Sequence, residues 1–242
     1  MPGYEVKHEQ VGIAGEADLR IRSLLDRQQF ADPLGAAEAL GISSAQWPLF
    51  GLLWPSGQRL ADHMARRVPV TGERILEIGC GLALASLVCH RAGADVTASD
   101  CHPLAEAFLR ENLRLNALPP LPYRHGQWGA AGAPGTPTAV GAGPGGDRDD
   151  SAPQGHFDLI IGSDVLYERD DGGTLCGYIA ALALPAAQVL IIDPERGNRA
   201  AFSRRMDALG FSLRQTRLDS PALGALAAYR GRLLDFRRGA AA

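Results

Sequence analysis

The sequence predicts an α/β protein built on a doubly wound sheet whose strands are mostly parallel. From residue 74 onward, short apolar stretches typical of strands alternate with longer amphipathic stretches typical of helices. The stretch from Ile75 to Asp100 shows this rhythm in one motif: a strand, a glycine turn, a helix, and a second strand that ends on an acid. Together these observations indicate the first half of a nucleotide-binding βαβ unit, followed by further units of the same kind.

The alternation of patterns defines each element in order. Strands are expected at residues 74–78, 95–99, 121–125, 157–162, 188–193, 211–218 and 228–237. Helices are expected at residues 83–92, 103–116, 172–184 and 198–209. The last two strands are joined by a short segment, so we expect them to form an antiparallel hairpin at the edge of a seven-stranded sheet.

A small N-terminal cap precedes this core. Residues 4–24 alternate loosely between apolar and polar side chains, which predicts a β-hairpin. Ser56 is predicted to be the N-cap of a following helix. The region is too short to be a separate domain, so we predict a hairpin and cap segment over residues 1–57 and a core domain over residues 58–242.

Residues 129–155 interrupt the rhythm of strands and helices. The segment is rich in glycine, alanine and proline and has almost nothing to bury. We expect a disordered insertion between two core strands, with a functional lid as the alternative. Because core strands are predicted on both sides, the segment does not mark a domain boundary.

Composition excludes several classes of protein. The net charge of −3 over 242 residues gives no electrostatic reason to expect binding to nucleic acid or to an anionic membrane. The N-terminus lacks a signal-peptide pattern, and no apolar run approaches the roughly 20 residues that span a bilayer. The histidines are scattered, so no metal site is expected.

Cysteine and lysine usage point to a cellular setting. The 4 cysteines include no CxxC pair, which favours a reduced, cytoplasmic protein without disulfides. Cys80 and Cys101 are expected to be small packing residues. Lys7 is the only lysine, and alanine and glycine are abundant, which suggests a GC-rich bacterial gene.

The glycine turn indicates which cofactor the protein binds. A dinucleotide fingerprint would have glycine where this chain has Leu84, and Glu77 would place a carboxylate beside the phosphates. No GK[ST] follows, which excludes a P-loop. S-adenosylmethionine fits better because it carries no phosphate and two cationic groups. Glu77 would favour these cations, directly or through water, and Asp100 would accept hydrogen bonds from the ribose.

The chain resembles a class I, seven-stranded, S-adenosylmethionine-dependent methyltransferase with a Rossmann-like fold. More narrowly, it is similar to the branch that contains protein-lysine methyltransferases and their nicotinamide N-methyltransferase-like relatives. The similarity covers residues 50–237 apart from the insertion. The similarity rests on the segments LLWPSGQRLADHM, ILEIGCGLALASL, VTASD, NLRLN, Trp128 and FDLIIGSDVLYERD. Ala83 stands where the family commonly has a third glycine.

The resemblance implies a set of cofactor-binding residues and S-adenosylhomocysteine as the product. The set comprises Trp54, Glu77, Gly79, Cys80, Gly81, Asp100, Trp128 and Ser163. Within it, the backbone of the glycine turn would contact the methionine part, and Asp100 would hold the ribose. Trp54 would border the cofactor and Trp128 would flank adenine, with core packing as the alternative for each.

The segment after the fourth core strand is the predicted catalytic end. Ligands of doubly wound sheets bind beyond the carboxyl ends of the strands, where Asp164 and Tyr167 follow residues 157–162. The DVLY sequence matches the Asp-x-x-Tyr motif of the lysine-methyltransferase branch. A carboxylate can hold an incoming amine, and an aromatic face tolerates the developing N-methyl cation. The alternative is that Asp164 caps a turn and Tyr167 packs.

Two further residues follow the fifth core strand in the sequence IIDPER. Asp193 and Arg196 could face a substrate, or they could form a salt bridge within the loop. Nucleic-acid amine methyltransferases usually carry [ND]PP[YF] after the fourth strand. This chain lacks that motif, so we do not expect a nucleic-acid substrate.

The sequence therefore predicts a monomeric methyltransferase that N-methylates a protein lysine side chain. One alternative is a small-molecule N- or O-methyltransferase. A second is a non-catalytic module that binds S-adenosylmethionine and a partner.

Overall fold

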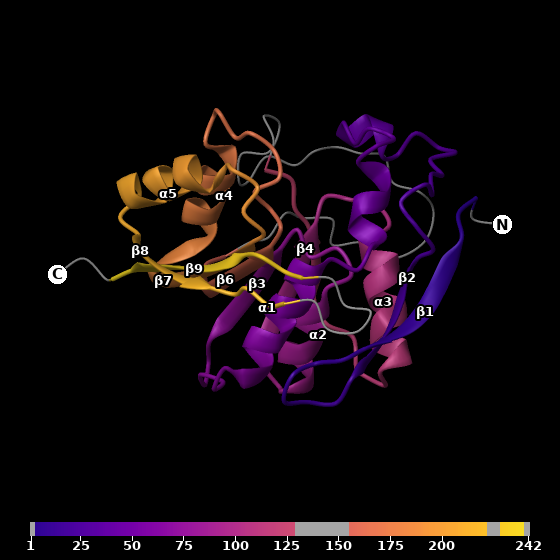
Figure 1. Ribbon diagram of the computed structural model, residues 1–242, viewed down its shortest axis with the longest axis horizontal. Helices are drawn as coiled ribbons and strands as arrows, with labels where there is room; N and C mark the ends of the chain where they lie inside the picture. The colour runs from indigo at the N-terminus through magenta and orange to yellow at the C-terminus, as the bar shows by residue number, and fades with distance from the viewer. Residues whose placement is uncertain (1–2, 129–154, 222–227, 240–242) are drawn as a thin grey trace.

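The computed structural model describes residues 3–128, 155–221 and 228–239. Within these ranges, seven strands form one mixed sheet in the order β5-β4-β3-β6-β7-β9-β8 (Figure 1). The first five of them are parallel, whereas β9 is antiparallel to both β7 and β8. The predicted fold class is confirmed, including the antiparallel C-terminal hairpin.

The elements agree closely with the predicted ones. The strands are β1 (Val6–Val11), β2 (Leu19–Leu24), β3 (Arg74–Ile78), β4 (Asp95–Asp100), β5 (Tyr123–His125), β6 (Phe157–Ser163), β7 (Ala183–Asp193), β8 (Ser212–Arg217) and β9 (Arg232–Arg238). The helices are α1 (Pro55–Arg66), α2 (Leu84–Arg91), α3 (Ala105–Leu115), α4 (Thr174–Leu182) and α5 (Arg199–Ala208), with the 3-10 turns η1 (Glu38–Leu40) and η2 (Trp47–Gly51). The largest differences in bounds are the earlier start of β7 and the later start of β9.

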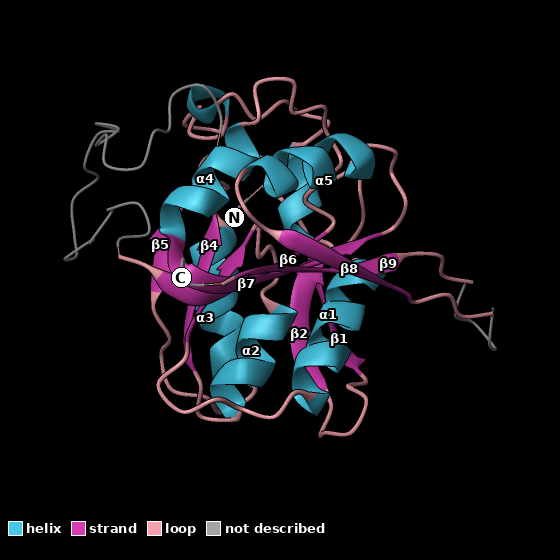
Figure 2. Ribbon diagram, turned by 90° about the vertical axis from the view of Figure 1, so that its left-hand side faces the viewer, coloured by secondary structure: helices cyan, strands magenta, loops and turns pink. Residues whose placement is uncertain are grey.

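Helices cover both faces of the sheet. Figure 2 shows α4 and α5 on one face and α1, α2 and α3 on the other. Alternate residues of the central strands supply the two cores: Ile75 packs with the α1 and α2 side, whereas Leu76 and Ile78 pack with the α4 and α5 side. A parallel strand buried on both faces is apolar along most of its length, which explains the nearly continuous apolar runs in the sequence.

The N-terminal hairpin is fastened to the core through α3. Strands β1 and β2 pair antiparallel, as predicted. The side chain of Asn112 accepts a hydrogen bond from the backbone N–H of Arg22 at 2.8 Å, and that of Asn116 accepts one from Arg20 at 2.9 Å. The two asparagines are the first and last residues of the NLRLN motif, so this motif attaches the cap to the core.

The prediction that Ser56 caps α1 is wrong. Trp54 occupies the N-cap position and Pro55 the first helical position, where a missing N–H is tolerated. The Ser56 hydroxyl is buried and lies 3.0 Å from the Tyr229 hydroxyl. The serine therefore links the start of α1 to the segment before β9.

Residues 129–154 of the predicted insertion lie outside the described residues. None of the helices in the described ranges is long and apolar enough to cross a membrane. The same ranges contain no group of three or more His, Cys, Asp or Glu side chains placed to hold a metal ion.

Candidate active site

The glycine turn after β3 has the backbone conformation that its sequence implies. Gly79 and Gly81 have φ values of 57° and 52°, in the left-handed region that favours glycine. A Cβ on Gly81 would lie 2.8 Å from the backbone oxygen of Phe50, and one on Gly79 would lie 3.1 Å from the Trp128 ring. A side chain on either glycine would therefore crowd the neighbouring atoms, so both positions favour glycine.

Ala83 also adopts the left-handed conformation, with φ 58°. It is the N-cap residue of α2 and its methyl group is fully buried. A left-handed conformation costs a residue with a Cβ about 1–2 kcal/mol. Glycine would adopt this conformation without the strain, and the buried methyl group offsets part of the cost to alanine.

Asp100 connects the glycine turn to the end of β4. Its carboxylate accepts hydrogen bonds from the backbone N–H groups of Gly81 and His102, each at 2.8 Å. The residue is buried, and burial raises the pKa of its carboxyl group above the ordinary value. Each carboxylate oxygen has a second lone pair, so both bonds leave capacity for a further donor such as a ribose hydroxyl.

Glu77 is held against the start of α2. Its carboxylate accepts hydrogen bonds from the backbone N–H of Ser86, at 2.8 Å, and from the Ser86 hydroxyl. An acid beside unpaired N–H groups and the positive end of a helix stabilises that helix. Burial raises the pKa of Glu77 to about 7. Glu77 thus has a structural role that the sequence did not predict, and its role toward the cofactor stays a prediction.

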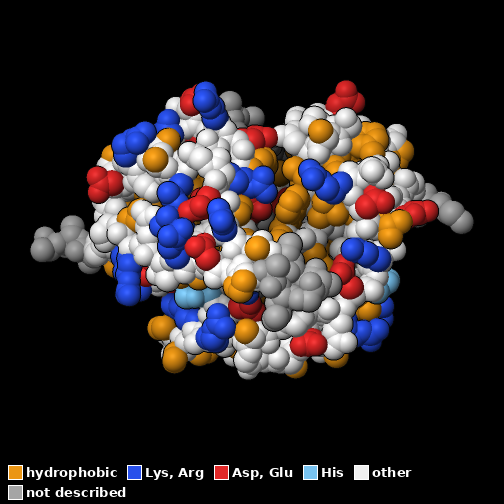
Figure 3. All heavy atoms as spheres, viewed as in Figure 1, with side chains coloured by type: hydrophobic (Ala, Val, Ile, Leu, Met, Phe, Trp, Pro, Cys, Tyr) orange, Lys and Arg blue, Asp and Glu red, His pale blue; other side chains and the backbone are white. Residues whose placement is uncertain are grey.

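The predicted site residues all line one cleft of about 890 Å³. These residues are Trp54, Glu77, Gly79, Cys80, Gly81, Asp100, Trp128, Ser163, Asp164 and Tyr167. The cleft opens in the hollow between the α4 and α5 side and the N-terminal segment around η1 and η2 (Figure 3). It lies where β3 has β4 on one side and β6 on the other, at the carboxyl ends of all three strands. Such a switch point is where doubly wound sheets bind ligands.

The two predicted tryptophans lie on different walls of the cleft. The Trp54 indole N–H donates a hydrogen bond to the backbone oxygen of Leu49 at 2.8 Å, which fixes the ring. Trp128 packs against Tyr178 with ring centroids 6.0 Å apart. Both tryptophans are half-buried, so each ring presents surface to the cleft and surface to the core.

Asp164 is held in place by its backbone and by an arginine. Its φ of 60° is left-handed, and its N–H donates to the backbone oxygen of Ile192 in β7 at 2.9 Å. The Arg196 guanidinium donates to both carboxylate oxygens, at 2.5 and 3.0 Å. This hydrogen bonding raises the pKa of Arg196 above its ordinary value, so the guanidinium keeps its charge.

Arg196 and Asp193 do not behave alike. The sequence left open whether they face a substrate or form a salt bridge with each other. Asp193 is buried at the end of β7, its carboxylate oxygens make no hydrogen bond to the described residues, and it does not line the cleft. Arg196 lines the cleft and pairs with Asp164, a contact between two loops that the sequence did not predict.

Tyr167 stands at the mouth of the cleft. Its side chain is 45% exposed, which is unusual for a large aromatic residue. The next residue, Glu168, accepts a hydrogen bond from the side chain of Gln46, beside η2. The loop after β6 and the N-terminal segment therefore meet across the cleft.

A pair of stacked rings beside Asp100 was not predicted from the sequence. His102 stacks on Phe50, with ring centroids 3.7 Å apart and an angle of 10° between the planes. Its Nδ1 accepts from the Leu104 N–H at 3.2 Å, so the ring proton belongs on Nε2. Burial lowers the pKa of His102 to about 3. Its position in the sequence could have identified His102 as a site residue, because it follows the carboxyl end of a core strand.

The arrangement separates the cleft into two ends. At one end, the glycine turn and Asp100 offer backbone surface and hydrogen-bond acceptors to a nucleoside. At the other end, Asp164, Arg196 and Tyr167 offer charge and an aromatic face. The two ends meet at Gly79. A Cβ added to Gly79 would lie 3.0 Å from the side chain of Val165, the residue after Asp164.

The chain is similar in sequence to lysine methyltransferases. It is 30% identical over 187 residues to protein N-lysine methyltransferase METTL21A of Danio rerio, covering 73% of this chain and 77% of that protein. It is 28% identical over 159 residues to electron transfer flavoprotein beta subunit lysine methyltransferase of Xenopus laevis, covering 64% and 55%. The match spans about half the length of the latter protein and of its Danio rerio counterpart.

Solved structures show the same fold at low identity. Ribosomal protein L11 methylase from Lactobacillus delbrueckii subsp. bulgaricus aligns with a TM-score of 0.55 at 16% identity, covering 98% of this chain and 100% of that one. Magnesium protoporphyrin IX methyltransferase (ChlM) from Synechocystis PCC 6803, solved with bound SAM, aligns with a TM-score of 0.52 at 16% identity, covering 76% and 78%.

No protein-family model matches the chain. The similarity to the Danio rerio METTL21A protein nevertheless extends over more than two thirds of both sequences. Together with the strand order and the cleft at the switch point, this similarity shows that the chain belongs to the class I methyltransferase family that includes the protein N-lysine methyltransferases.

Proposed function

We propose that the protein transfers a methyl group from S-adenosylmethionine to the side-chain amine of a lysine in a protein substrate. The observation that carries this proposal is the position of Asp164, which shares one cleft with the glycine turn and Asp100. The names of the relatives support a lysine acceptor, because the proteins matched over the longest stretches are lysine methyltransferases.

The residues at the glycine turn fit the proposed cofactor. The positions of Gly79 and Gly81 form a cradle whose space a Cβ would fill, so a ligand can lie against the backbone there. Asp100 retains free lone pairs for the ribose, and the volume of the cleft is typical of small-molecule sites. We assign Trp54, Cys80, Trp128 and Ser163 to the walls around the cofactor. Bound S-adenosylmethionine supplies an electrophilic methyl group on a cationic sulfur.

The remaining residues of the cleft can prepare the acceptor. Methyl transfer needs a neutral amine in line with the reacting methyl, so the protein mainly contributes alignment and exclusion of water. The Asp164 carboxylate can hold the incoming ammonium group by a charge-assisted hydrogen bond. The Tyr167 ring can lie against the cationic N-methyl product. The ammonium group must first lose a proton, which would leave to solvent through the open mouth where Tyr167 stands. The neutral amine can then form the new bond to the methyl carbon while the bond from that carbon to sulfur breaks.

We also propose a cytoplasmic monomer of bacterial origin. The four cysteines are free, and Cys80, Cys89 and Cys176 are buried, as expected for a protein folded under reducing conditions. The bacterial origin rests on composition alone, because the relatives matched over most of their length are from vertebrates and yeast. Analytical ultracentrifugation of the purified protein tests the monomer.

The test of the function is incubation with S-adenosylmethionine labelled in the methyl group and a bacterial lysate. We expect label in one or a few protein bands, and acid hydrolysis of those bands should yield N-methylated lysine. Excess S-adenosylhomocysteine should abolish the labelling. Label that appears only in the small-molecule fraction would instead establish the small-molecule alternative.

A cheaper measurement tests the cofactor separately. Saturating S-adenosylhomocysteine should raise the Tm, because a ligand that binds only the folded state stabilises it by mass action. An unchanged Tm at saturating ligand would contradict the cofactor assignment. A clear increase in Tm without any labelling would favour the non-catalytic binding module.

A further inference from the structure

The contacts around Arg196 define a second feature of the cleft. Its guanidinium donates to both carboxylate oxygens of Asp164 and lies 5.9 Å from the centroid of the Trp54 ring. A carboxylate and an aromatic face are the two kinds of group that hold alkylammonium ions in proteins. The guanidinium thus lies in a setting that would suit the end of a lysine side chain.

The loop that carries Arg196 is anchored independently of this contact. Glu195 and Gly197 on either side have φ values of 62° and 90°, so the chain turns sharply there. The Glu195 carboxylate pairs with Arg232 of β9 at 3.0 Å. The Trp54 ring is likewise fixed by its own bond to Leu49. Removal of the guanidinium would therefore leave the surrounding walls in place.

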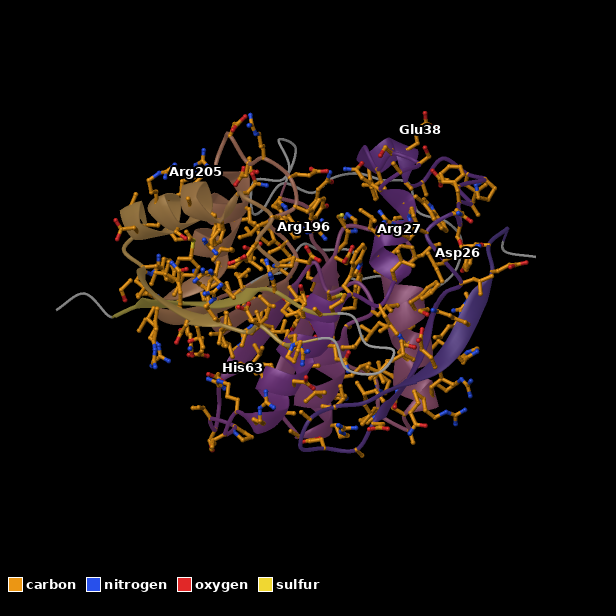
Figure 4. The ribbon with its side chains drawn as sticks, in the orientation of Figure 1. Asp26, Arg27, Glu38, His63, Arg196 and Arg205 are labelled. Carbon is orange, nitrogen blue, oxygen red and sulfur yellow. The ribbon has the colours of Figure 1, made fainter. Side chains whose placement is uncertain are left out.

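The ion pair is exposed enough for exchange. The Arg196 side chain is 40% exposed, compared with 12% for Asp164. The guanidinium can be solvated when it leaves Asp164, because its side chain is already in contact with water. A competing cation that reaches Asp164 can therefore replace the guanidinium. Figure 4 shows Arg196 in the central part of the molecule, with Arg205 farther out along α5.

We infer that Asp164 and the Trp54 ring form a cation cage that Arg196 occupies at rest, and that an acceptor lysine enters it by displacing Arg196. This inference rests on the proposed function, because it takes a lysine as the acceptor. It makes Arg196 a positioning residue that sets how tightly the site holds alkylammonium groups. Neutral acceptors such as hydroxyl compounds would gain nothing from the exchange, so the cage selects for amines.

The test uses n-butylammonium chloride as a probe for the end of a lysine side chain. Its affinity for the full chain, saturated with S-adenosylhomocysteine, is measured by isothermal titration calorimetry. Arg196→Gln keeps the length of the side chain and removes its charge. We expect this variant to bind n-butylammonium at least tenfold more tightly than the wild type. In an Asp164→Asn background, Arg196→Gln should have no effect.

Two controls separate the cage from general electrostatics. Arg205→Gln also removes a cation from the cleft wall, but Arg205 contacts the backbone oxygen of Asp171 and not Asp164. It should leave n-butylammonium binding unchanged. Trp54→Leu in the Arg196→Gln background should weaken binding severalfold. Arg196→Met replaces Arg196→Gln if that variant fails to bind S-adenosylhomocysteine and so is not folded.

Several outcomes would overturn the inference. Arg196→Gln could bind the probe no more tightly than the wild type, or Arg205→Gln could have the same effect. Undetectable binding to every variant would count against it as well. Tight binding to Arg196→Gln in a protein that labels no lysine would preserve the cage and contradict the proposed function, so the two can fail separately.

Discussion

The two ends of the cleft hold their carboxylates in different ways. At the end with the glycine turn, Glu77 and Asp100 are buried, and their carboxylates accept hydrogen bonds from backbone N–H groups of nearby chain segments. At the acceptor end, Asp164 is partly exposed and is satisfied by Arg196 from another loop. Backbone partners cannot leave without local unfolding, whereas an arginine side chain can rotate away.

This difference predicts which end of the cleft is coupled to folding. At the cofactor end, the Glu77 and Asp100 carboxylates organise the glycine turn and the start of α2, so substitutions there should alter stability and cofactor binding together. At the acceptor end, the Asp164 carboxylate supports little of the fold, so substitutions there should alter methyl transfer alone.

Asp164→Asn should lower methyl transfer by about 10²-fold, the loss expected when a reacting amine is no longer held in line. Asparagine tolerates the left-handed φ of this position, so the backbone should not change. Because the lost ion pair is partly exposed, we expect stability to change by no more than about 1 kcal/mol. Initial rates, urea unfolding and S-adenosylhomocysteine affinity are the measurements.

The matched control is Asp171→Asn, a carboxylate on the rim of the same cleft whose side chain is exposed. Its transfer rate should equal that of the wild type within twofold. An Asp164→Asn protein that loses cofactor affinity as well as activity would show that the two ends are not separable.

Gly81→Ala should destabilise the fold by roughly 2–4 kcal/mol, typical of a clash combined with an unfavourable φ. The new Cβ would lie 2.8 Å from the backbone oxygen of Phe50, which cannot move freely. Urea unfolding measures the change, and calorimetry should show weakened S-adenosylhomocysteine binding. Gly93→Ala is the control, because that glycine also has a positive φ but no atom within 4 Å of its Cβ position. It should cost only about 1 kcal/mol.

Glu77→Gln should change how stability depends on pH. Burial raises the pKa of Glu77 from 4.5 to about 7, so the folded protein holds this proton more tightly than the unfolded chain does. The resulting stabilisation is complete below pH 4.5 and is lost as the pH rises to about 7. At about 1.4 kcal/mol per pKa unit, the change is roughly 3 kcal/mol.

The measurement is the free energy of unfolding of wild type and variant between pH 4.5 and 8.5. Since glutamine does not titrate, the wild type should lose stability relative to the variant up to about pH 7 and run parallel to it above. Titrating groups that do not interact with Glu77 are common to both proteins and cancel in the difference. A difference that does not vary with pH would contradict the assigned cause.

Ala83→Gly should have the smallest effect, within about 1 kcal/mol. It relieves the left-handed strain of about 1–2 kcal/mol, but it removes a buried methyl group worth about 0.8 kcal/mol and adds backbone entropy to the unfolded chain. Ala85→Gly is the comparison, since Ala85 is equally buried within α2 and has no strain to relieve. Urea unfolding should show that it loses roughly 1–2 kcal/mol. Equal losses in both variants would exclude strain at Ala83.

Much of the fold followed from the sequence because the pattern was local. Strands β3 and β6 are mostly apolar since both faces are buried, and the alternation with helices leaves few possible topologies. The predictions failed where a contact with a distant part of the chain decides the role of a residue. Ser56 has the side chain of an N-cap, but Tyr229, far along the chain, holds its hydroxyl and leaves the N-cap position to Trp54.

The candidate site, like the fold, could be predicted only where it depends on local patterns in the sequence. The residues at the carboxyl ends of β3, β4 and β6 could be placed in one cleft because parallel strands end at a common edge. His102 and Phe50 were missed because their stacking joins the end of one strand to the distant N-terminal segment. No spacing in the sequence records such a contact.

The order of elements, the glycine turn and the identity of the carboxylates follow from local sequence, since each depends on a few neighbouring residues. The contacts of each carboxylate follow only from the packing of the folded chain: Ser86 for Glu77, the glycine turn for Asp100, and Arg196 for Asp164. A charge in a folded protein is governed by its burial and its partners. Those are set by how distant segments pack.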